Sequence, residues 1–379
     1  MRLVMPTCSE HLLGARTALI AGLFALGLAA CAPKKPVPAE PTPPAPAAGT
    51  AAAPAGNNSM AGMPGMEGMD HGHMMTPEQM AELRSKVPLY AASTDEQIMA
   101  NMGRMPPNFW ALISPKDMQG PVGVVALGHG YKLGGNEQFE NYAGPIAQTH
   151  PTAVAAGMAM DSSAHIQSAL DELTSKHGVK TIVVVPMEPG DDTSLVRQWR
   201  YIFGLRDDSS YLTPPRVKTD AKIIFTKSPA ADPRIGTIMR DYAMEVAGPH
   251  PEQDRVVLVS HGPERPENNP AELALLEKHA DEIRQSSKFT DIKVLSIEDD
   301  AVPEIRATRV AELRAYIKEA TDQGREVVIV PLILTKGGFH ARLQKDLEGL
   351  DYKFANRGLI EHPLFQEWIS ATVRDAAGS

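Results

Sequence analysis

Apolar and polar residues follow each other along most of the chain in a pattern that predicts strands separated by amphipathic helices. From about residue 120, short β-branched runs such as "PVGVVALGHG", "KTIVVVPMEPG" and "VVLVSHGP" end in turns rich in glycine or proline. Longer segments such as "SSAHIQSALDELTSKHG" place apolar residues three and four positions apart. Buried strands that alternate with helices are typical of parallel sheets. We therefore expect an α/β fold.

This pattern occurs twice in the same order. "VGVVALGHG" returns as "RVVLVSHGP", "HIQSALDELTSKHGVKTIVVVP" returns as "RVAELRAYIKEATDQGREVVIVP", and "SPAADPRIGTIMRDYA" returns as "RGLIEHPLFQEWISAT". Ordered repetition at similar spacing indicates a duplicated unit. We predict two similar halves, 120–250 and 251–379, each with a four-stranded parallel sheet and helices on both faces.

Two short helices are predicted before the first half. "TPEQMAELRSK" and "STDEQIMANM" each combine a threonine cap with a glutamine three positions later, which is the sequence signature of a capping box. We expect residues 76–119 to form a short helical collar.

The N-terminal residues have the features of a targeting segment. Arginines precede the apolar run "TALIAGLFALGLAA", which is too short to span a bilayer comfortably, and Cys31 follows it. The four residues ending at Cys31 resemble a bacterial lipobox, so we expect 1–30 to be a lipoprotein signal peptide and Cys31 to be lipidated. The mature protein would then be a periplasm-facing lipoprotein, with the outer membrane favoured. An uncleaved membrane anchor is the alternative.

Residues 31–75 are predicted to be a disordered tether. The segment is rich in proline and alanine and has almost no large apolar residue before position 60. Its end, "MAGMPGMEGMDHGHMM", combines thioethers and imidazoles, which are ligands that suit Cu⁺. A copper site and a low-complexity linker are equally compatible with this tract. Its candidate ligands are Met60, Met63, Met66, Met69, His71, His73, Met74 and Met75.

Composition and charge exclude one class of function. The 379 residues are 43% hydrophobic and 22% charged, as in an ordinary globular protein, and the formal net charge is −9. An acidic chain without a basic stretch does not favour nucleic acid as a partner. The motifs of phosphate-binding loops, dinucleotide-binding turns, serine hydrolases and zinc proteases are also missing from the sequence.

Three histidines at predicted strand ends are the main candidates for chemistry. His129 and His261 each end the first strand of a half and precede glycine, and His340 follows the later strand in "VPLILTKGGFH". Ligands of open parallel sheets bind beyond the carboxyl ends of the strands. Neutral imidazole binds divalent transition metals and also accepts protons near neutral pH. We predict His261 and His340 as one metal site, although loop histidines that only bond the backbone are an alternative.

The ordered motifs resemble the class II tetrapyrrole metal chelatases, in particular sirohydrochlorin cobaltochelatases and ferrochelatases of the CbiX/SirB type. The resemblance rests on the duplicated His-Gly, the "VVVP" and "VIVP" strands, and "VPLILTKGGFH". It implies two flavodoxin-like halves that face each other across a central cleft. It also implies insertion of a divalent metal, with Co²⁺ favoured over Ni²⁺ or Fe²⁺, into a tetrapyrrole, with His261, His340 and His129 as ligands or bases.

A binding protein is the second hypothesis. The lipobox and the Met/His tract favour a periplasmic lipoprotein that binds metal, copper included, or tetrapyrrole without turnover. The first half lacks a counterpart of His340, where Glu188, Asp191 and Asp192 are candidate acids, although helix capping is favoured for the two aspartates. His362 is expected to cap a helix, and five other histidines are expected at the surface or in loops: His150, His165, His177, His250 and His279.

Overall fold

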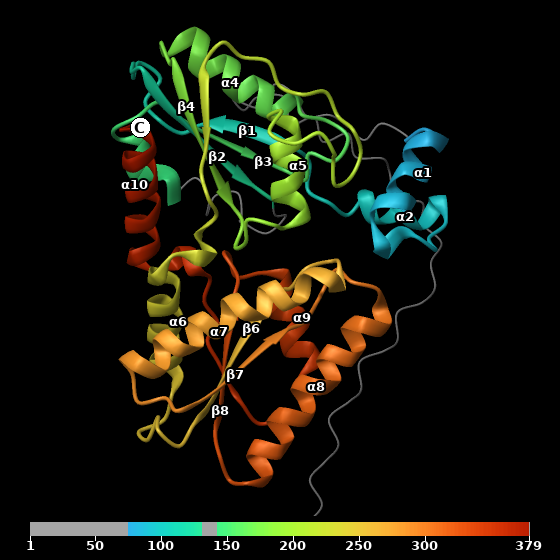
Figure 1. Cartoon of the computed structure of the whole chain (residues 1–379), viewed down its shortest axis with the longest axis vertical. Coiled ribbons are helices and arrows are strands. Elements are labelled where there is room, and N and C mark those ends of the chain that lie inside the picture. Colours follow the sequence, from blue (N-terminus) through green and yellow to red (C-terminus); the bar gives the residue numbers. More distant parts are fainter. Residues whose placement is uncertain (1–74, 131–141, 379) are drawn as a thin grey trace, which may run out of the picture. The chain divides into compact units, whose positions relative to one another are not determined.

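The computed structural model describes residues 75–130 and 142–378, and within them the predicted α/β architecture is confirmed. Strands and helices alternate through both halves (Figure 1). The helices and strands up to residue 246 are α1 (Pro77–Lys86), α2 (Asp95–Met102), β1 (Phe109–Leu112), β2 (Val122–Gly128), β3 (Thr152–Ala156), α4 (Ala164–Lys176), β4 (Thr181–Met187), α5 (Ser194–Ile202), β5 (Lys222–Phe225) and α6 (Pro233–Val246). Those that follow are β6 (Arg255–Ser260), α7 (Asn269–Ser286), β7 (Asp291–Ser296), α8 (Pro303–Asp322), β8 (Val327–Leu332), α9 (Gly338–Asp346), β9 (Lys353–Phe354) and α10 (Pro363–Ala377).

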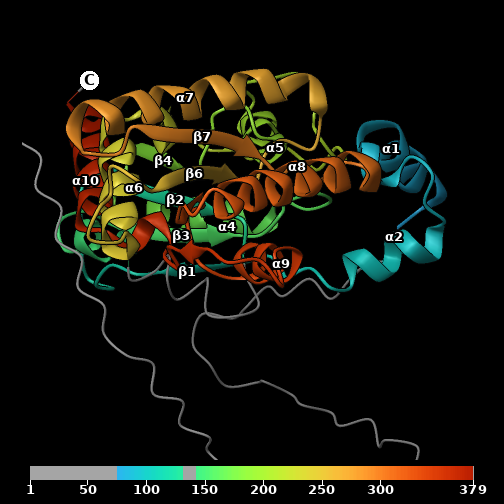
Figure 2. The ribbon, with the colours of Figure 1, turned by 90° about the horizontal axis from the view of Figure 1, so that it is seen from below.

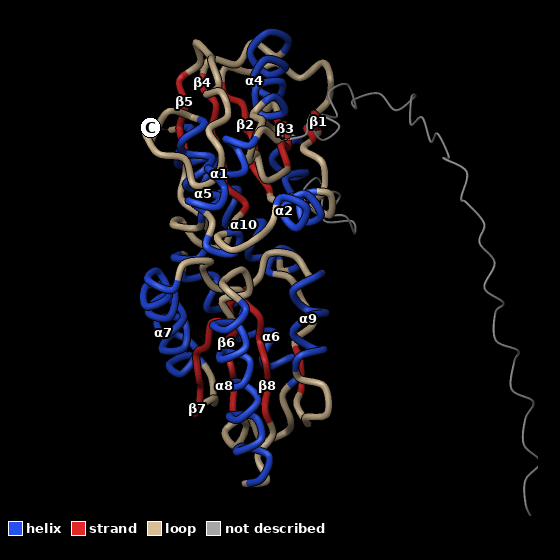
Figure 3. The backbone as a smooth tube through the Cα atoms, turned by 90° about the vertical axis from the view of Figure 1, so that its right-hand side faces the viewer, coloured by secondary structure: helices blue, strands red, loops and turns tan. Residues whose placement is uncertain are grey.

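Each half contains one sheet, and the two sheets have the same parallel core. The first has the order β1-β3-β2-β4-β5 and the second β7-β6-β8-β9, so β2 and β6 hold equivalent central places. Figure 3 shows β7, β6 and β8 side by side in this order. The sequence repeat therefore corresponds to a repeat of topology.

The first sheet differs from the prediction at one edge. β1, within the segment expected to be a helical collar, pairs antiparallel with β3, so this sheet has five strands. The prediction that 76–119 is only helical is wrong, because the segment "FWAL" completes a sheet edge. The two predicted helices α1 and α2 are present, and both capping boxes, at Thr76 and Thr94, are formed.

The last helix of each half packs on the other half. One hydrophobic cluster joins residues of β2, β3 and β4 to α10, and residues of β6, β7 and β8 to α6. The rings of Tyr142 and Phe365 lie 4.6 Å apart between centroids, and the Tyr242 hydroxyl donates to the carbonyl of Gly358 at 3.0 Å. α6 and α10 are in contact, and α10 lies above α6 in Figure 1; Figure 2 shows the same two helices from below. The boundary predicted at 250 divides the sequence repeat, but the packed units exchange these helices.

Both exchanged helices are capped at their start, and the cap at His362 is the one that the sequence predicts. Asp232 accepts from the backbone N–H of Arg234 at 2.9 Å, and His362 Nδ1 accepts from that of Leu364 at 3.2 Å. Such caps satisfy donors that have no partner within the helix. None of the helices in the described parts of the chain is long and apolar enough to cross a membrane.

Candidate metal centre at the strand ends

His129 and His261 occupy equivalent positions beyond the central strands β2 and β6. In each case the ring Nδ1 donates to the carbonyl of the next residue, Gly130 at 2.8 Å and Gly262 at 3.1 Å. A carbonyl only accepts, so Nδ1 carries the proton in both rings and Nε2 carries the lone pair of the neutral form. The duplicated His-Gly pair therefore fixes the orientation of both imidazoles.

Glycine is required after His261 for a structural reason. Gly262 has φ +81°, and a Cβ atom there would lie 2.1 Å from Ser296 Oγ and 2.7 Å from the backbone nitrogen of Glu298. A side chain would thus clash with the loop that follows β7. The close approach of these two loops also brings the aspartates of the β7 loop to His261.

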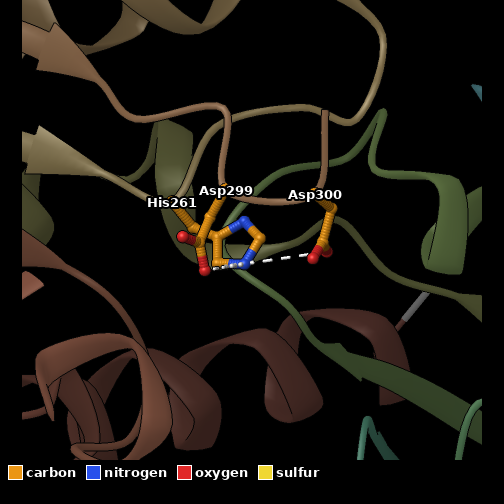
Figure 4. A group of neighbouring side chains, drawn as sticks. All are labelled: His261, Asp299 and Asp300. Carbon is orange, nitrogen blue, oxygen red and sulfur yellow. Dashed lines mark ion pairs between the residues drawn. The ribbon is translucent and has the colours of Figure 1, made fainter. Parts of the chain in front are cut away.

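Two aspartates lie beside His261 and form a group with metal-ligand spacing. His261 Nε2 is 3.6 Å from Asp299 Oδ2 and 3.7 Å from Asp300 Oδ2, and one such atom from each residue lies within 4.8 Å of the others (Figure 4). The backbone N–H of Asp299 donates to the carbonyl of His261 at 2.9 Å. One imidazole and two carboxylates suit a divalent metal and leave positions open for other ligands.

Glu298 supports the position of the two aspartates. Its backbone has φ +50°, an uncommon value for a residue other than glycine, and its side chain is fully buried. The carboxylate pairs with Arg309 at 2.5 Å and accepts from Asn269 Nδ2 at 3.1 Å. These bonds stabilise the turn that directs the next two side chains toward His261.

The electrostatics of the group are those of interacting opposite charges. Burial opposes the charged imidazolium of His261, but the carboxylates of Asp300 and Asp299 outweigh this effect, so its pKa is raised. Burial also opposes ionisation of Asp299, but His261 and the guanidinium of Arg342 hold its pKa below the usual range. Asp299 is therefore ionised at neutral pH.

Sequence reasoning missed both aspartates. They directly follow β7 in "VLSIEDD", and β7 is the parallel neighbour of the central strand β6. By strand register, the equivalent positions of the first half are Ala159 and Met160, which are buried apolar residues. Among the described residues, this group is therefore found in the second half, and a comparison of the two strand ends shows the difference.

Two residues of the first half, His129 and Glu188, interact electrostatically with His261 and Asp300. Burial lowers the pKa of His129, with Asp300 and His261 among the charges that act on it. Glu188, which follows β4, has its pKa raised to about 7 by burial, with opposing effects of His261 and Asp300. The two halves are also in direct contact here, because Ser194 Oγ at the start of α5 donates to Glu264 Oε1 at 2.6 Å.

Asp191 and Asp192 do not cap α5. The cap is Thr193, whose hydroxyl accepts from the backbone N–H of Val196 at 3.2 Å. Asp191 instead accepts from the backbone N–H of Ser228 at 2.8 Å and pairs with Arg200. The capping role predicted for the aspartates is thus performed by the next residue.

His340 lies in the first turn of α9, and its predicted pairing with His261 stays a prediction. The residue of α9 that contacts His261 is Phe339, with ring centroids 5.4 Å apart. His340 is buried, and its Nε2 donates to the carbonyl of Arg357 at 3.0 Å. Within residues 75–130 and 142–378, His340 belongs to no group of three metal-capable side chains. Adjacent side chains of a helix point about 100° apart, so Phe339 and His340 face different directions. The sequence alone does not show which of the two faces His261.

The other residues predicted as ligands lie outside the described residues or away from this group. Cys31 and the tract from Met60 to Met74 lie outside the described residues. Met75 is partly buried and packs against the hydrophobic cluster on the outer face of the first sheet. Three histidines expected at the surface or in loops are buried on or beside helices instead: His165, His177 and His279.

Known proteins resemble this chain in part of its sequence and in its fold. The sirohydrochlorin cobaltochelatase of Methanothermobacter thermautotrophicus is 29% identical over 130 residues, which is 32% of this chain and 89% of that protein. SirB from Bacillus subtilis, solved with Fe³⁺, aligns with a TM-score of 0.51 and 14% identity, covering 69% of this chain and 96% of SirB. No family model matches the chain.

Proposed function

We propose that this chain, which resembles the class II tetrapyrrole metal chelatases in sequence and in fold, inserts a divalent metal into a sirohydrochlorin-type tetrapyrrole. Co²⁺ is the favoured metal, with Ni²⁺ and Fe²⁺ as alternatives. The group of His261, Asp299 and Asp300 beyond the strand ends of the second sheet is the observation that carries the proposal. Ligands of parallel α/β sheets bind at this edge.

The group suits a metal that must be held and then released. His261 Nε2 and one oxygen from each aspartate supply three ligand atoms to an octahedral ion, and water or pyrrole nitrogens take the other positions. Carboxylates and a single imidazole bind less tightly than a closed four-ligand site. Transfer to the macrocycle then proceeds by exchange of protein ligands for pyrrole nitrogens.

The loss of two pyrrole protons requires acceptors near the metal. Glu188 has a pKa of about 7 because of burial, so it accepts a proton near neutral pH without being permanently ionised. His129 has a lowered pKa and is neutral at this pH, with Nδ1 as its donor atom. We assign these two residues of the first half as the bases for metallation.

A binding protein without turnover is the second candidate. Its tetrapyrrole-binding form is favoured by the contact of Phe339 with His261 and by the pairing of Arg342 with Asp299, since both place a group that does not bind metal beside the site. The lipid anchor at Cys31, the periplasm-facing location and Cu⁺ capture by the tract at 60–75 are further proposals. They are tested by lipid labelling of Cys31→Ser and by Cu⁺ titration after deletion of the tract.

Sirohydrochlorin absorbance with Co²⁺, Ni²⁺ or Fe²⁺ separates the two candidates. An enzyme accelerates the metal-dependent spectral change above the uncatalysed rate, and His261→Ala abolishes the acceleration. His340→Ala in the same assay tests the second predicted ligand, and His250→Ala, which removes an exposed histidine, is the matched control. Binding of macrocycle at one equivalent with no acceleration supports the binding protein and contradicts the enzyme.

A further inference from the structure

Two arginines pair with Asp299 in unequal ways. Arg306 donates to Asp299 Oδ1 at 2.8 Å and to Asp346 Oδ2 at 2.6 Å, so two carboxylates hold it. Arg342, on α9, donates through Nε to Asp299 Oδ2 at 2.9 Å, and Asp299 is the acidic partner seen for it in the described structure. The Arg306 side chain is 25% exposed, whereas that of Arg342 is 52% exposed. The Arg306 guanidinium is thus bound by two carboxylates, whereas that of Arg342 is bound by one.

The oxygen that Arg342 occupies is also the oxygen that the metal needs. Asp299 Oδ2 accepts from Arg342 and is the atom that lies 3.6 Å from His261 Nε2. A divalent ion between these atoms would stand beside the guanidinium and share its acceptor. Like charges repel strongly where a carboxylate is as little exposed as Asp299, at 2%. Metal and Arg342 therefore compete for one carboxylate oxygen.

We propose that Arg342 exchanges partners during the reaction: it neutralises Asp299 while the site is empty, and it binds a carboxylate of the macrocycle once metal has taken its place. This inference rests on the proposed function and adds an order of binding to it. Sirohydrochlorin-type tetrapyrroles carry several acetate and propionate side chains, which are anions with the planar geometry that a guanidinium fork binds in a bidentate manner.

The position of Arg342 on α9 keeps the released side chain at the site. The same helix carries Phe339, which contacts His261. The guanidinium also lies along Gly338, where an added Cβ would be 3.2 Å from Arg342 Nη1. Glycine there leaves room for the Arg342 side chain to move. Metal binding would thereby prepare a site for the anionic macrocycle.

The first test uses metal alone on the full-length protein. Co²⁺ titrations by calorimetry compare the wild type with Arg342→Ala, Arg342→Lys, His261→Ala and the control Lys345→Ala, which removes an exposed cation of the same helix. We expect several-fold tighter binding in Arg342→Ala, a smaller gain in Arg342→Lys, and no change in Lys345→Ala. Unchanged or weaker binding in Arg342→Ala, while His261→Ala still abolishes binding, overturns the exchange and leaves the proposed function standing. Absence of Co²⁺ binding in the wild type and in every variant overturns the proposed function itself.

The second test releases Arg342 without metal. Uroporphyrin, an octacarboxylate porphyrin, is titrated by fluorescence in the presence of a chelator against the wild type, Asp299→Asn, Arg342→Ala and the double variant. Asp299→Asn should bind uroporphyrin several-fold more tightly, and the double variant should lose that gain. An equal gain in the single and double variants means that removal of a negative charge is the whole effect, and this result refutes a role for Arg342 in binding carboxylates.

Discussion

Among single residues, Asp300 is the most direct test of the metal group. It is exposed, lies 3.7 Å from His261 Nε2, and is not fixed by two arginines as Asp299 is. Asp300→Asn should weaken Co²⁺ binding by about tenfold or more, because a neutral amide oxygen replaces a carboxylate ligand. Asp322→Asn, which removes an exposed carboxylate paired with Lys318, is the control. Equal Co²⁺ affinity in both variants and the wild type, measured by calorimetry, would exclude Asp300 as a ligand.

The raised pKa of Glu188 predicts that the free energy of unfolding depends on pH. Its pKa is raised from 4.5 to about 7 by burial, so the folded state binds its proton more tightly than the unfolded state. The stability that this proton provides is fully present below about pH 4.5 and is lost as pH rises through about 7. Glu188→Gln should therefore gain stability over the wild type as pH rises across this range, by on the order of 3 kcal/mol at pH 8. Urea unfolding at several pH values measures the difference, and a difference that does not change with pH contradicts the raised pKa.

The sequence was sufficient for some site residues and insufficient for others. His129 and His261 were predictable because β-branched runs that end in His-Gly locate a strand end without knowledge of neighbouring strands. Asp299 and Asp300 required knowledge that β7 lies beside β6, and strand order is set by packing of the whole half. The direction of the His340 side chain could be predicted only if the first residue of α9 were known. Glycines at 337 and 338 give no hydrophobic pattern that would indicate where this helix begins.

At the scale of one element, α9 determines which ring faces His261. Phe339→His should place an imidazole near His261 and tighten Zn²⁺ binding by about tenfold or more, since a second nitrogen ligand joins the group. His340→Ala should leave Zn²⁺ affinity unchanged and lower stability by about 1–3 kcal/mol, because a buried hydrogen bond to Arg357 is lost. Calorimetry and urea unfolding measure the two effects. Loss of Zn²⁺ binding in His340→Ala would support the pairing of His261 with His340 that the sequence predicts.

The elements also differ in how well their hydrophobic pattern predicts them. The central strands β2, β4, β6 and β8 are buried on both faces, which produces the apolar runs that reveal them. β1 is half-buried throughout and β9 has two residues, so neither has a run long enough to be recognised. Edge strands depend on a neighbour for their structure, and the residues of β3 that pair with β1 lie 41 to 47 positions further along the chain.

For the whole molecule, the exchange of α6 and α10 makes each half depend on the other. Phe365 of α10 is fully buried and contacts Tyr142 of the first half and Trp368 of its own helix. Phe365→Ala should cost about 3–5 kcal/mol, because a large buried ring is replaced by a cavity. The loss of stability should affect the first sheet as well, although Phe365 belongs to the sequence of the second half.

Native-state hydrogen exchange locates this loss. Phe365→Ala should reduce amide protection in β2, β3 and β4, which share a hydrophobic cluster with α10. Leu343→Ala is the matched control, since Leu343 lies on α9, is fully buried and packs only in the cluster on the outer face of the second sheet. It should reduce protection in β6 and β8 without a comparable effect on β2 and β4. If Phe365→Ala reduces protection only in β6, β7 and β8, the exchanged helix does not couple the two halves. Other contacts would then have to hold His129 and Glu188 near His261.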